Sequence, residues 1–148
     1  MMIRLANKND ASAMVNFNQA MALETEGKTL DSETLRHGVE AVFEKSDCGF
    51  YVVAEEDEQI VGGLMVTFEW SDWRNNWFWW IQSVYILPEF RGRKIYSALY
   101  AFVKNLAEKQ GNVCGFRLYV EHDNEKAQRV YEKLGMESSH YLMYEEMV

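Results

Sequence analysis

Leu-Pro-Glu-Phe-Arg-Gly-Arg-Lys-Ile-Tyr, residues 87–96, is the stretch around which this chain is organised. It follows a strongly apolar run and opens a long amphipathic segment, which is typical of a turn between a strand and a helix. Three cations, Arg91, Arg93 and Lys94, flank Gly92 in this turn. Unpaired N–H groups at a helix N-terminus or in a tight turn bind anions. The stretch therefore indicates a phosphate site, although a solvated basic turn would have the same composition.

The charge of the chain is distributed unevenly. The 148 residues carry a formal net charge of −8, yet the segment from Val84 to Gln110 holds five basic and two acidic residues. A basic island in an acidic chain favours a single anionic ligand. The net charge of −8 argues against a nucleic-acid partner, whose recognition would normally require a basic face. The acidic remainder could attract a cationic substrate or simply maintain solubility.

Length and composition predict one cytoplasmic domain over residues 1–148. Hydrophobic residues make up 48% of the sequence, enough for a core without disulfides, and Cys48 and Cys114 are too few for a disulfide framework. The N-terminus lacks an apolar leader, and the longest aromatic run, Trp77–Ile81, is far too short for a membrane span. We therefore expect no membrane partner. The three histidines show no metal-ligand spacing, so we expect no metal.

Hydrophobic periodicity predicts a mixed α/β chain in the order β-α-α-β-β-β-α-β-α-β. The expected strands are 2–6, 50–55, 60–70, 77–86, 114–120 and 140–147, and the expected helices are 11–22, one starting at Asp31 or Ser32, 95–110, and one from Asp123 or Asn124 to Gly135. Gly62-Gly63 within the third strand predicts a bulge or a close backbone approach.

One parallel strand pair follows from this order. The strand over 77–86, the helix over 95–110 and the strand over 114–120 form a βαβ unit, whose crossover is right-handed. Ligands of such sheets bind at the carboxyl ends of the parallel strands. The basic turn at residues 87–96 lies at that end, which places the predicted phosphate site there.

The sequence resembles the GNAT superfamily of acetyl-coenzyme A-dependent N-acetyltransferases. Two features carry the resemblance: the Arg91-Gly92-Arg93 turn after a strand, and the segment Tyr119-Val120-Glu121-His122-Asp123-Asn124…Ala127…Tyr131…Leu134-Gly135-Met136. The second feature is the more specific, and the similarity covers essentially the whole chain. It implies the GNAT-like fold, with a splayed parallel strand pair that receives acetyl-CoA.

The resemblance also implies roles for individual residues. The strand of Val84, Tyr85 and Ile86 would pair through its backbone with the pantetheine arm, and Asn124 would hydrogen-bond pantetheine or the adjacent backbone. Tyr131 would protonate the leaving thiolate. The backbone amides of the turn would wrap the pyrophosphate, and the residues that would supply them are Arg91, Gly92, Arg93, Lys94, Ile95 and Tyr96.

The spacing in the last helix is compatible with these roles. Asn124, Ala127 and Tyr131 lie at positions i, i+3 and i+7, so they share one helical face. The small Ala127 between two polar side chains leaves room for a ligand arm. Tyr131 keeps its proton at neutral pH, since its reference pKa is about 10. Packing as an ordinary aromatic residue is the alternative interpretation of Tyr131.

Two positions depart from the family pattern in the phosphate turn. Lys94 and Tyr96 occupy sites where the family usually has glycine or a very small residue, which lets the backbone approach a phosphate closely. Lys94 can still present its N–H and adds a positive charge. Tyr96 predicts a more open turn or a ring that covers the cofactor.

A general base is harder to identify. The stretch from Phe68 to Trp73, followed by an aromatic strand, resembles the layout of the diamine N-acetyltransferases, yet Gln82 and Ser83 stand where a strand carboxylate is often found. Neither side chain has a pKa that would suit a general base, but both could orient the substrate. The carboxylates considered as the base or as part of the acceptor site are Glu24, Glu26, Glu69 and Asp72.

We therefore expect an acyltransferase that moves an acetyl group from acetyl-CoA to the primary amine of a small molecule by direct attack. Two alternatives stay open: a protein or peptide acceptor, and a non-catalytic coenzyme A-binding sensor module. The five tryptophans between residues 70 and 80 could pack the core, line an acceptor pocket or form the surface of a homodimer.

Overall fold

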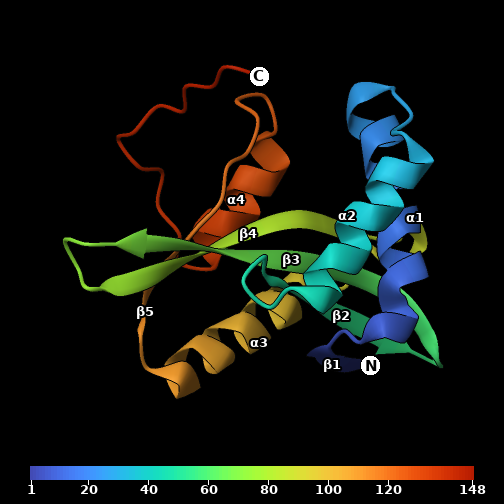
Figure 1. Cartoon of the computed structure of the whole chain (residues 1–148), viewed down its shortest axis with the longest axis horizontal. Helices are drawn as coiled ribbons and strands as arrows, with labels where there is room; N and C mark the ends of the chain where they lie inside the picture. The colour runs from blue at the N-terminus through green and yellow to red at the C-terminus, as the bar shows by residue number, and fades with distance from the viewer. The chain divides into compact units, whose positions relative to one another are not determined.

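The computed structural model describes residues 1–148, which form two compact units, Met1–Leu118 and Tyr119–Val148. The first unit is a five-stranded sheet in the order β1-β2-β3-β4-β5 with three α-helices (Figure 1). Its strands are β1 Met2–Leu5, β2 Phe50–Glu56, β3 Gln59–Ser71, β4 Asn76–Ile86 and β5 Val113–Arg117, and its helices are α1 Ala11–Glu26, α2 Ser32–Glu44 and α3 Ile95–Gln110. The second unit contains α4, Glu125–Lys133.

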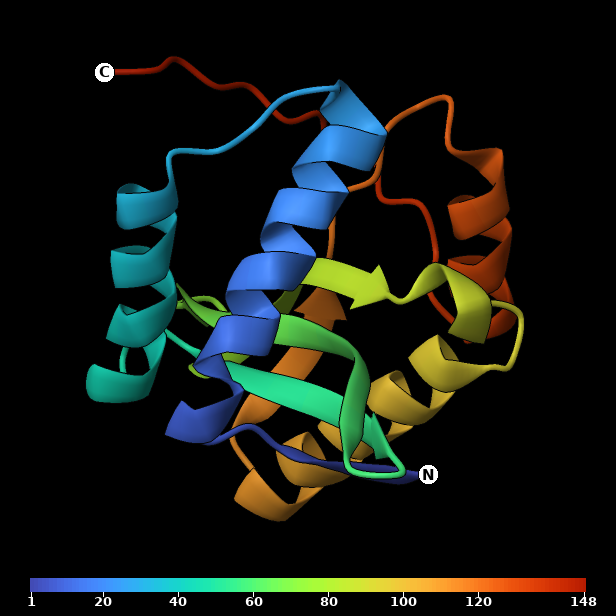
Figure 2. The same ribbon diagram turned by 90° about the vertical axis from the view of Figure 1, so that its right-hand side faces the viewer.

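The sheet of the first unit is covered on both faces. Helices α1 and α2 lie on one face and α3 lies on the other (Figures 1 and 2). Alternation along β2 explains this layering, since Tyr51 and Val53 pack with Met14 and Phe17 of α1, while the intervening Val52 is also fully buried. The central strands are apolar on both faces because both faces are covered.

Pairing in the sheet is antiparallel except at one edge. Strands β1 to β4 form antiparallel ladders, and β4 pairs with β5 in parallel, as the βαβ pattern predicted. The helix between them begins at Ile95 and ends at Gln110, and Gly111 follows in the left-handed conformation with φ +81°. The predicted fold class, a mixed α/β sheet, is confirmed.

The glycine pair in β3 lies where the backbones approach closely. A Cβ on Gly62 would lie 2.7 Å from Ile86 Cδ1 and 3.2 Å from the Tyr85 carbonyl oxygen, and one on Gly63 would lie 3.1 Å from the Val52 carbonyl oxygen. The register against β2 shifts between Ala54 and Glu55, beside this pair. Both predicted consequences, a bulge and a close approach, are confirmed.

The strand predicted over 114–120 is too long. The ladder with β4 ends at the Trp80–Arg117 pair, and residues 118–120 have no regular secondary structure. Aromatic and β-branched content favours extended backbone there, but a strand also needs a partner that takes up its N–H and C=O groups. The parallel pair is therefore short, and the following part of β4 has no paired strand on that side.

One further boundary differs from prediction, and one predicted strand is absent. Helix α1 continues past Ala22 to Glu26, because Glu24 and Glu26 tolerate a helix and Gly27, with φ +63°, is the residue that ends it. The closing strand expected over 140–147 is absent, and the tyrosine, leucine and methionine side chains at 141–144 are exposed. Their composition is strand-like, yet the segment pairs with no other strand. None of the helices is long and apolar enough to cross a membrane.

Candidate functional site

The open edge of β4 is the first component of the site. Residues Trp77–Trp80 pair with β5, whereas the stretch from Ile81 to Ile86 pairs only with β3. The Ile86 carbonyl accepts from Arg91 Nε at 2.9 Å. The other backbone groups of this stretch that face the β5 side are available to an extended ligand, which would add to the sheet like a further strand. The predicted cofactor-pairing residues Val84, Tyr85 and Ile86 all lie here.

A bulge at Ser83 shapes this edge. Against β3, Gly63 pairs with Tyr85 but Met65 pairs with Gln82, so β4 contains one extra residue between these pairs. Ser83 has φ +52°, a left-handed conformation that non-glycine residues seldom adopt. A bulge bends its strand and disrupts the ladder locally. It lies directly before Val84, at the start of the proposed pantetheine-pairing stretch.

The turn after β4 is a cradle of backbone amides. Gly92 and Lys94 both have left-handed φ values, +80° and +61°, and α3 begins at the next residue, Ile95. The N–H groups of Gly92, Arg93 and Lys94 make no hydrogen bond within the chain. Successive free amides of this kind, together with the first turn of a helix, favour an oxyanion. The turn is therefore compatible with the predicted phosphate site.

Arg91 is held differently from the residues that follow it. Its N–H already donates to the Pro88 carbonyl at 3.2 Å, and its guanidinium donates to the Ile86 carbonyl and to Glu24, both at 2.9 Å. The same guanidinium lies 5.3 Å from the centre of the Tyr85 ring. Arg93 lies over the Phe90 ring at 4.8 Å, and its Nη1 lies 4.0 Å from Glu56 Oε2, whereas Lys94 forms no ion pair.

Glu24 is a carboxylate with two donors. It accepts from Arg91 and, at 3.0 Å, from the hydroxyl of Tyr85. The bond from Arg91 lowers the pKa of Glu24, burial opposes this effect, and the bond from Tyr85 adds to it. A carboxylate with a lowered pKa accepts a proton poorly. Glu24 therefore connects α1 to the phosphate turn and is badly suited to be the general base.

Glu69 and Asp72 lie away from the bulge. Glu69 accepts from Trp80 Nε1 at 2.8 Å and from Arg117 at 2.9 Å; burial raises its pKa, but these two donors outweigh burial and leave it lowered. Asp72 lies in the turn between β3 and β4. At about 3.3 Å per residue, the six residues from Asn76 to Gln82 put roughly 20 Å between that turn and Gln82. Glu26, the last residue of α1, pairs with Lys28 at 3.4 Å.

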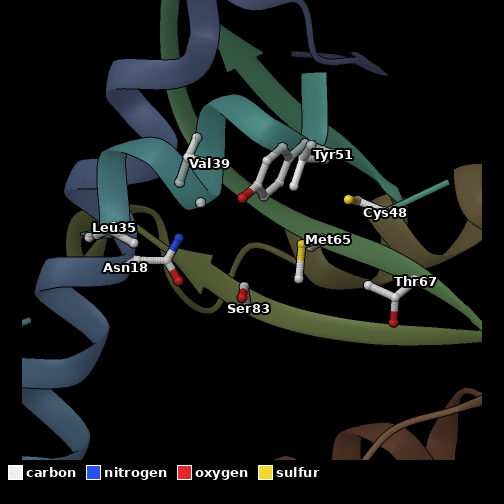
Figure 3. Close-up of a pocket in the computed structure, with 10 residues that line it drawn as sticks. Asn18, Leu35, Val39, Cys48, Tyr51, Met65, Thr67 and Ser83 are labelled. Atoms are coloured by element: carbon white, nitrogen blue, oxygen red, sulfur yellow. The ribbon is translucent and has the colours of Figure 1, made fainter. Parts of the chain in front are cut away.

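Gln82 and Ser83 lie on the face of the sheet that α1 and α2 cover. Gln82 Nε2 donates to Thr67 Oγ1 across the β3–β4 ladder. Ser83 lines a cavity of about 320 Å³ between α1, α2 and the sheet (Figure 3). The other lining residues are Asn18, Leu35, Gly38, Val39, Val42, Cys48, Tyr51, Met65 and Thr67.

None of the tryptophans borders this cavity. Trp79 is 2% exposed and packs against Phe50 with ring centres 5.3 Å apart, so it is a core residue. Trp70 and Trp73 are 48% and 88% exposed and lie at the far end of the β3–β4 hairpin. Trp79 thus agrees with the core alternative, whereas the alternative of an acceptor pocket lined by tryptophan finds no support in this cavity.

The second unit carries the three remaining predicted residues on one short helix. Asn124 is the N-cap of α4, and its Oδ1 accepts the N–H of Ala127 at 3.1 Å. Its Nδ2 donates to no acceptor in the chain and can serve a ligand. Tyr131 lies two turns along α4, and burial raises the pKa of its hydroxyl. Tyr131 thus stays protonated at neutral pH, as a proton donor must.

Sequence reasoning missed most of the cavity. Asn18, Cys48 and Tyr51 come from α1, the α2–β2 loop and β2, and no spacing in the sequence relates them. The usable signal was Gly38, a glycine in the middle of the amphipathic helix α2. Glycine is unfavourable there unless space is required beside the helix. No three His, Cys, Asp or Glu side chains gather closely enough to hold a metal ion.

A family model described as the acetyltransferase (GNAT) family matches residues 14–136. The chain belongs to the GNAT acetyltransferase family. GNAT enzymes use acetyl-CoA, which agrees with the open β4 edge and the amide cradle after it. No curated protein matches the chain.

Solved structures show the same fold. A possible acetyltransferase from Clostridium difficile 630 is 43% identical, with a TM-score of 0.92 over 99% of this chain and 97% of that one. A predicted acetyltransferase from Clostridium acetobutylicum, solved with acetyl-CoA, is 20% identical, with a TM-score of 0.79 over 98% and 95%. AAC(6')-Iy, in complex with the bisubstrate analogue CoA-S-monomethyl-acetylneamine, is 17% identical, with a TM-score of 0.79 over 99% and 97%.

Proposed function

We propose that this chain is an N-acetyltransferase that transfers the acetyl group of acetyl-CoA to the primary amine of a small molecule. The observation that supports this most strongly is a juxtaposition at the Ser83 bulge. On one side of the bulge β4 presents an edge that does not pair with β5 and leads to the amide cradle, and the cavity lies beside it on the face that α1 and α2 cover. Two ligands bound at these places would meet at residues 83–84.

The reaction is a direct acyl transfer. The amine nitrogen forms a bond to the acetyl carbonyl carbon, the carbon–sulfur bond breaks, and the proton lost by nitrogen is balanced by the proton gained by sulfur. Acetyl-CoA supplies the activated acyl group. The contribution of the chain is to hold both reactants in attack geometry, which can account for a large part of the rate.

Individual residues divide this work. Val84, Tyr85 and Ile86 would pair with the pantetheine arm, and an N–H of this stretch would donate to the acetyl carbonyl oxygen as negative charge develops on it. Gly92, Arg93 and Lys94 would hold the pyrophosphate through their N–H groups, with Ile95 and Tyr96 in the first turn of α3 beside them. Asn124 and Ala127 would border the arm from α4.

Tyr131 would donate to the departing sulfur. A coenzyme A thiol has a pKa near 8.5 by analogy with cysteine, and the tyrosine reference is about 10, so full proton transfer to the thiolate is uphill by roughly 2 kcal/mol. Burial of Tyr131 increases this difference. We therefore assign Tyr131 a hydrogen bond that stabilises the thiolate as it forms. The proton that the amine loses balances the proton that the sulfur gains.

The exposed tryptophans do not favour a protein acceptor. An opening around Trp70–Asn76 would be the sign of a large substrate, but this turn is at the opposite end of β4 from Ser83. The cavity beside Ser83 is of small-molecule size, at the lower end of the usual range for ligand pockets. The acceptor is thus proposed to be a metabolite-sized amine.

The test combines binding with turnover. Acetyl-CoA at 100 times its Kd should stabilise the protein by about 2.7 kcal/mol, and a thiol reagent should detect coenzyme A released in the presence of an accepted amine. Tyr131→Phe should lower kcat at least tenfold while acetyl-CoA still raises Tm. Tyr144→Phe is the control, since Tyr144 is 88% exposed in the same unit. Unchanged turnover in Tyr131→Phe would remove the assigned role, and no stabilisation by acetyl-CoA would remove the function.

A further inference from the structure

We propose that the cavity beside Ser83 is the acceptor pocket and that it selects a primary amine carried on an uncharged, mainly apolar body of small-molecule size. The inference rests on the transferase function proposed above and adds the class of substrate. It is argued from the ten side chains and backbone groups around one space within the first unit (Figure 3).

The lining of the cavity contains no charged residue. Leu35, Val39 and Val42 of α2 and Met65 of β3 supply apolar surface, and the remaining side chains are neutral. This is notable in a chain of which 26% of the residues are charged and whose net charge is −8. An unpaired charge costs free energy when it leaves water, so this lining disfavours a substrate that carries a fixed charge on the part that enters the cavity.

A polyamine is therefore a poor fit. Its second ammonium would enter the cavity with no carboxylate to receive it, because no Asp or Glu lines the space. The nearby Glu24 carboxylate is already occupied by Arg91 and Tyr85. The resemblance of residues 68–73 to the diamine enzymes thus does not extend to the pocket.

Polar atoms are placed where the reacting amine would lie. Ser83 brings its hydroxyl to the cavity at the β4 bulge, and Asn18 brings its carboxamide from α1. Asn18 Nδ2 is engaged with the Met14 carbonyl at 2.9 Å, so its Oδ1 remains as an acceptor for an amine N–H. These two groups orient a neutral amine without providing a strong base.

The same lining accounts for the missing general base. Transfer of an ammonium group into a neutral, apolar space favours loss of its proton, since desolvation lowers the pKa of a cationic acid. Tyr51 cannot act as an anionic partner, because burial raises the pKa of its hydroxyl to about 12. The cavity would therefore take up the amine in its neutral, nucleophilic form.

The size of the cavity limits the substrate body. At about 320 Å³ the cavity lies at the lower end of the usual range for ligand pockets, so it suits a small organic molecule. Hexylamine and 2-phenylethylamine are within this limit. A matched comparison is hexylamine against hexane-1,6-diamine, which have nearly the same length but differ by a second charge.

The first experiment measures kcat/KM for these two amines by coenzyme A release. We expect hexylamine to be preferred at least tenfold. Leu35→Glu, which places a carboxylate in the lining, should shift this ratio at least tenfold toward the diamine. Equal use of the two amines by the wild-type enzyme, or a ratio that Leu35→Glu leaves unchanged, would overturn the proposal.

The second experiment fills the cavity without disturbing the fold. Gly38 lines the cavity, and a Cβ built on it meets no atom within 4 Å. Gly38→Leu should raise KM for hexylamine at least tenfold while acetyl-CoA still raises Tm as in the wild type. The control is His37→Leu, since His37 is the neighbouring exposed residue of α2 and does not line the cavity. The same KM in both variants would contradict the assignment.

A binding readout separates this inference from the proposed function. Cys48 lines the cavity and is exposed, whereas Cys114 lies at β5, so alkylation is followed by mass spectrometry in Cys114→Ser protein. Hexylamine should slow the modification of Cys48 at least threefold, and hexane-1,6-diamine should not. Protection without any coenzyme A release would overturn the transferase and support the pocket. Coenzyme A release with no protection of Cys48 would support the transferase and overturn the pocket.

Discussion

Replacement of Lys94 tests the conformation of the phosphate turn. Lys94 precedes α3 with φ +61° and ψ +27°, in the left-handed region. This conformation costs an L-residue with a side chain roughly 1–2 kcal/mol, a cost that glycine avoids. Glycine in turn loses more backbone entropy on folding, by roughly 0.5–1 kcal/mol. The net expectation is that Lys94→Gly is more stable than Lys94→Ala by about 1 kcal/mol.

The difference can be expressed as a melting temperature. An entropy of unfolding of about 2.1 cal/mol/K per residue gives roughly 310 cal/mol/K for a chain of this length, so 1 kcal/mol corresponds to about 3 °C. Thermal unfolding followed by circular dichroism resolves such a shift. Both variants lose the same exposed charge, so comparing them isolates the backbone conformation.

Lys104 provides the control with the opposite sign. It lies in the middle of α3, where glycine is less favourable than alanine by about 1 kcal/mol. Lys104→Gly should therefore melt about 3 °C below Lys104→Ala, while Lys94→Gly should melt about 3 °C above Lys94→Ala. If glycine lowered Tm at both positions, Lys94 would be an ordinary helical residue and the left-handed cradle would be refuted.

Two further predictions concern the surroundings of the site. Burial raises the pKa of Tyr51 from 10 to about 12, so the folded state holds this proton more tightly than the unfolded state, and about 2.7 kcal/mol of stability should be lost as the pH rises from 10 to 12. Urea unfolding at several alkaline pH values should show a smaller loss for Tyr51→Phe, and parallel curves would contradict the shift. Glu24→Gln removes the ion pair with the half-exposed Arg91, so it should cost at most about 1 kcal/mol. It should also tighten acetyl-CoA binding two- to threefold in calorimetry, because the guanidinium becomes available to phosphate; weaker binding would show that the pair positions the turn instead.

Local signals account for the parts of the fold that the sequence predicted well. Helix α3 lies at Ile95–Gln110 because its apolar spacing, the preceding turn and Gly111 are all encoded within a few residues of its ends. Asp31 caps α2 by accepting the N–H of Thr34, which is again a contact three residues long. The parallel pair followed from connection length alone, since a helix between two strands returns the chain to the same edge.

Features that depend on a distant partner could not be predicted. Strand β5 ends at Arg117 because its pairing with β4 ends there. Residues 140–147 have the composition of a strand but no neighbouring strand to pair with. The left-handed conformation of Ser83 could not be predicted either, because serine, unlike glycine, is not a residue that indicates a positive φ. The cavity is assembled from α1, α2 and three strands, and only Gly38 gave a local sign of it.

The bulge at Ser83 would allow the two proposed binding places to share one strand. Before the bulge, alternate residues of β4 face opposite sides of the sheet; the extra residue lets both Gln82 and Ser83 lie on the side covered by α1 and α2, and the alternation then resumes with Tyr85 packed on Phe17 at 5.3 Å. The bulge falls in the part of β4 that no longer pairs with β5. The acceptor side and the cofactor side of the proposed site are thus set by the same residue, and a change that straightened β4 at Ser83 would affect both at once.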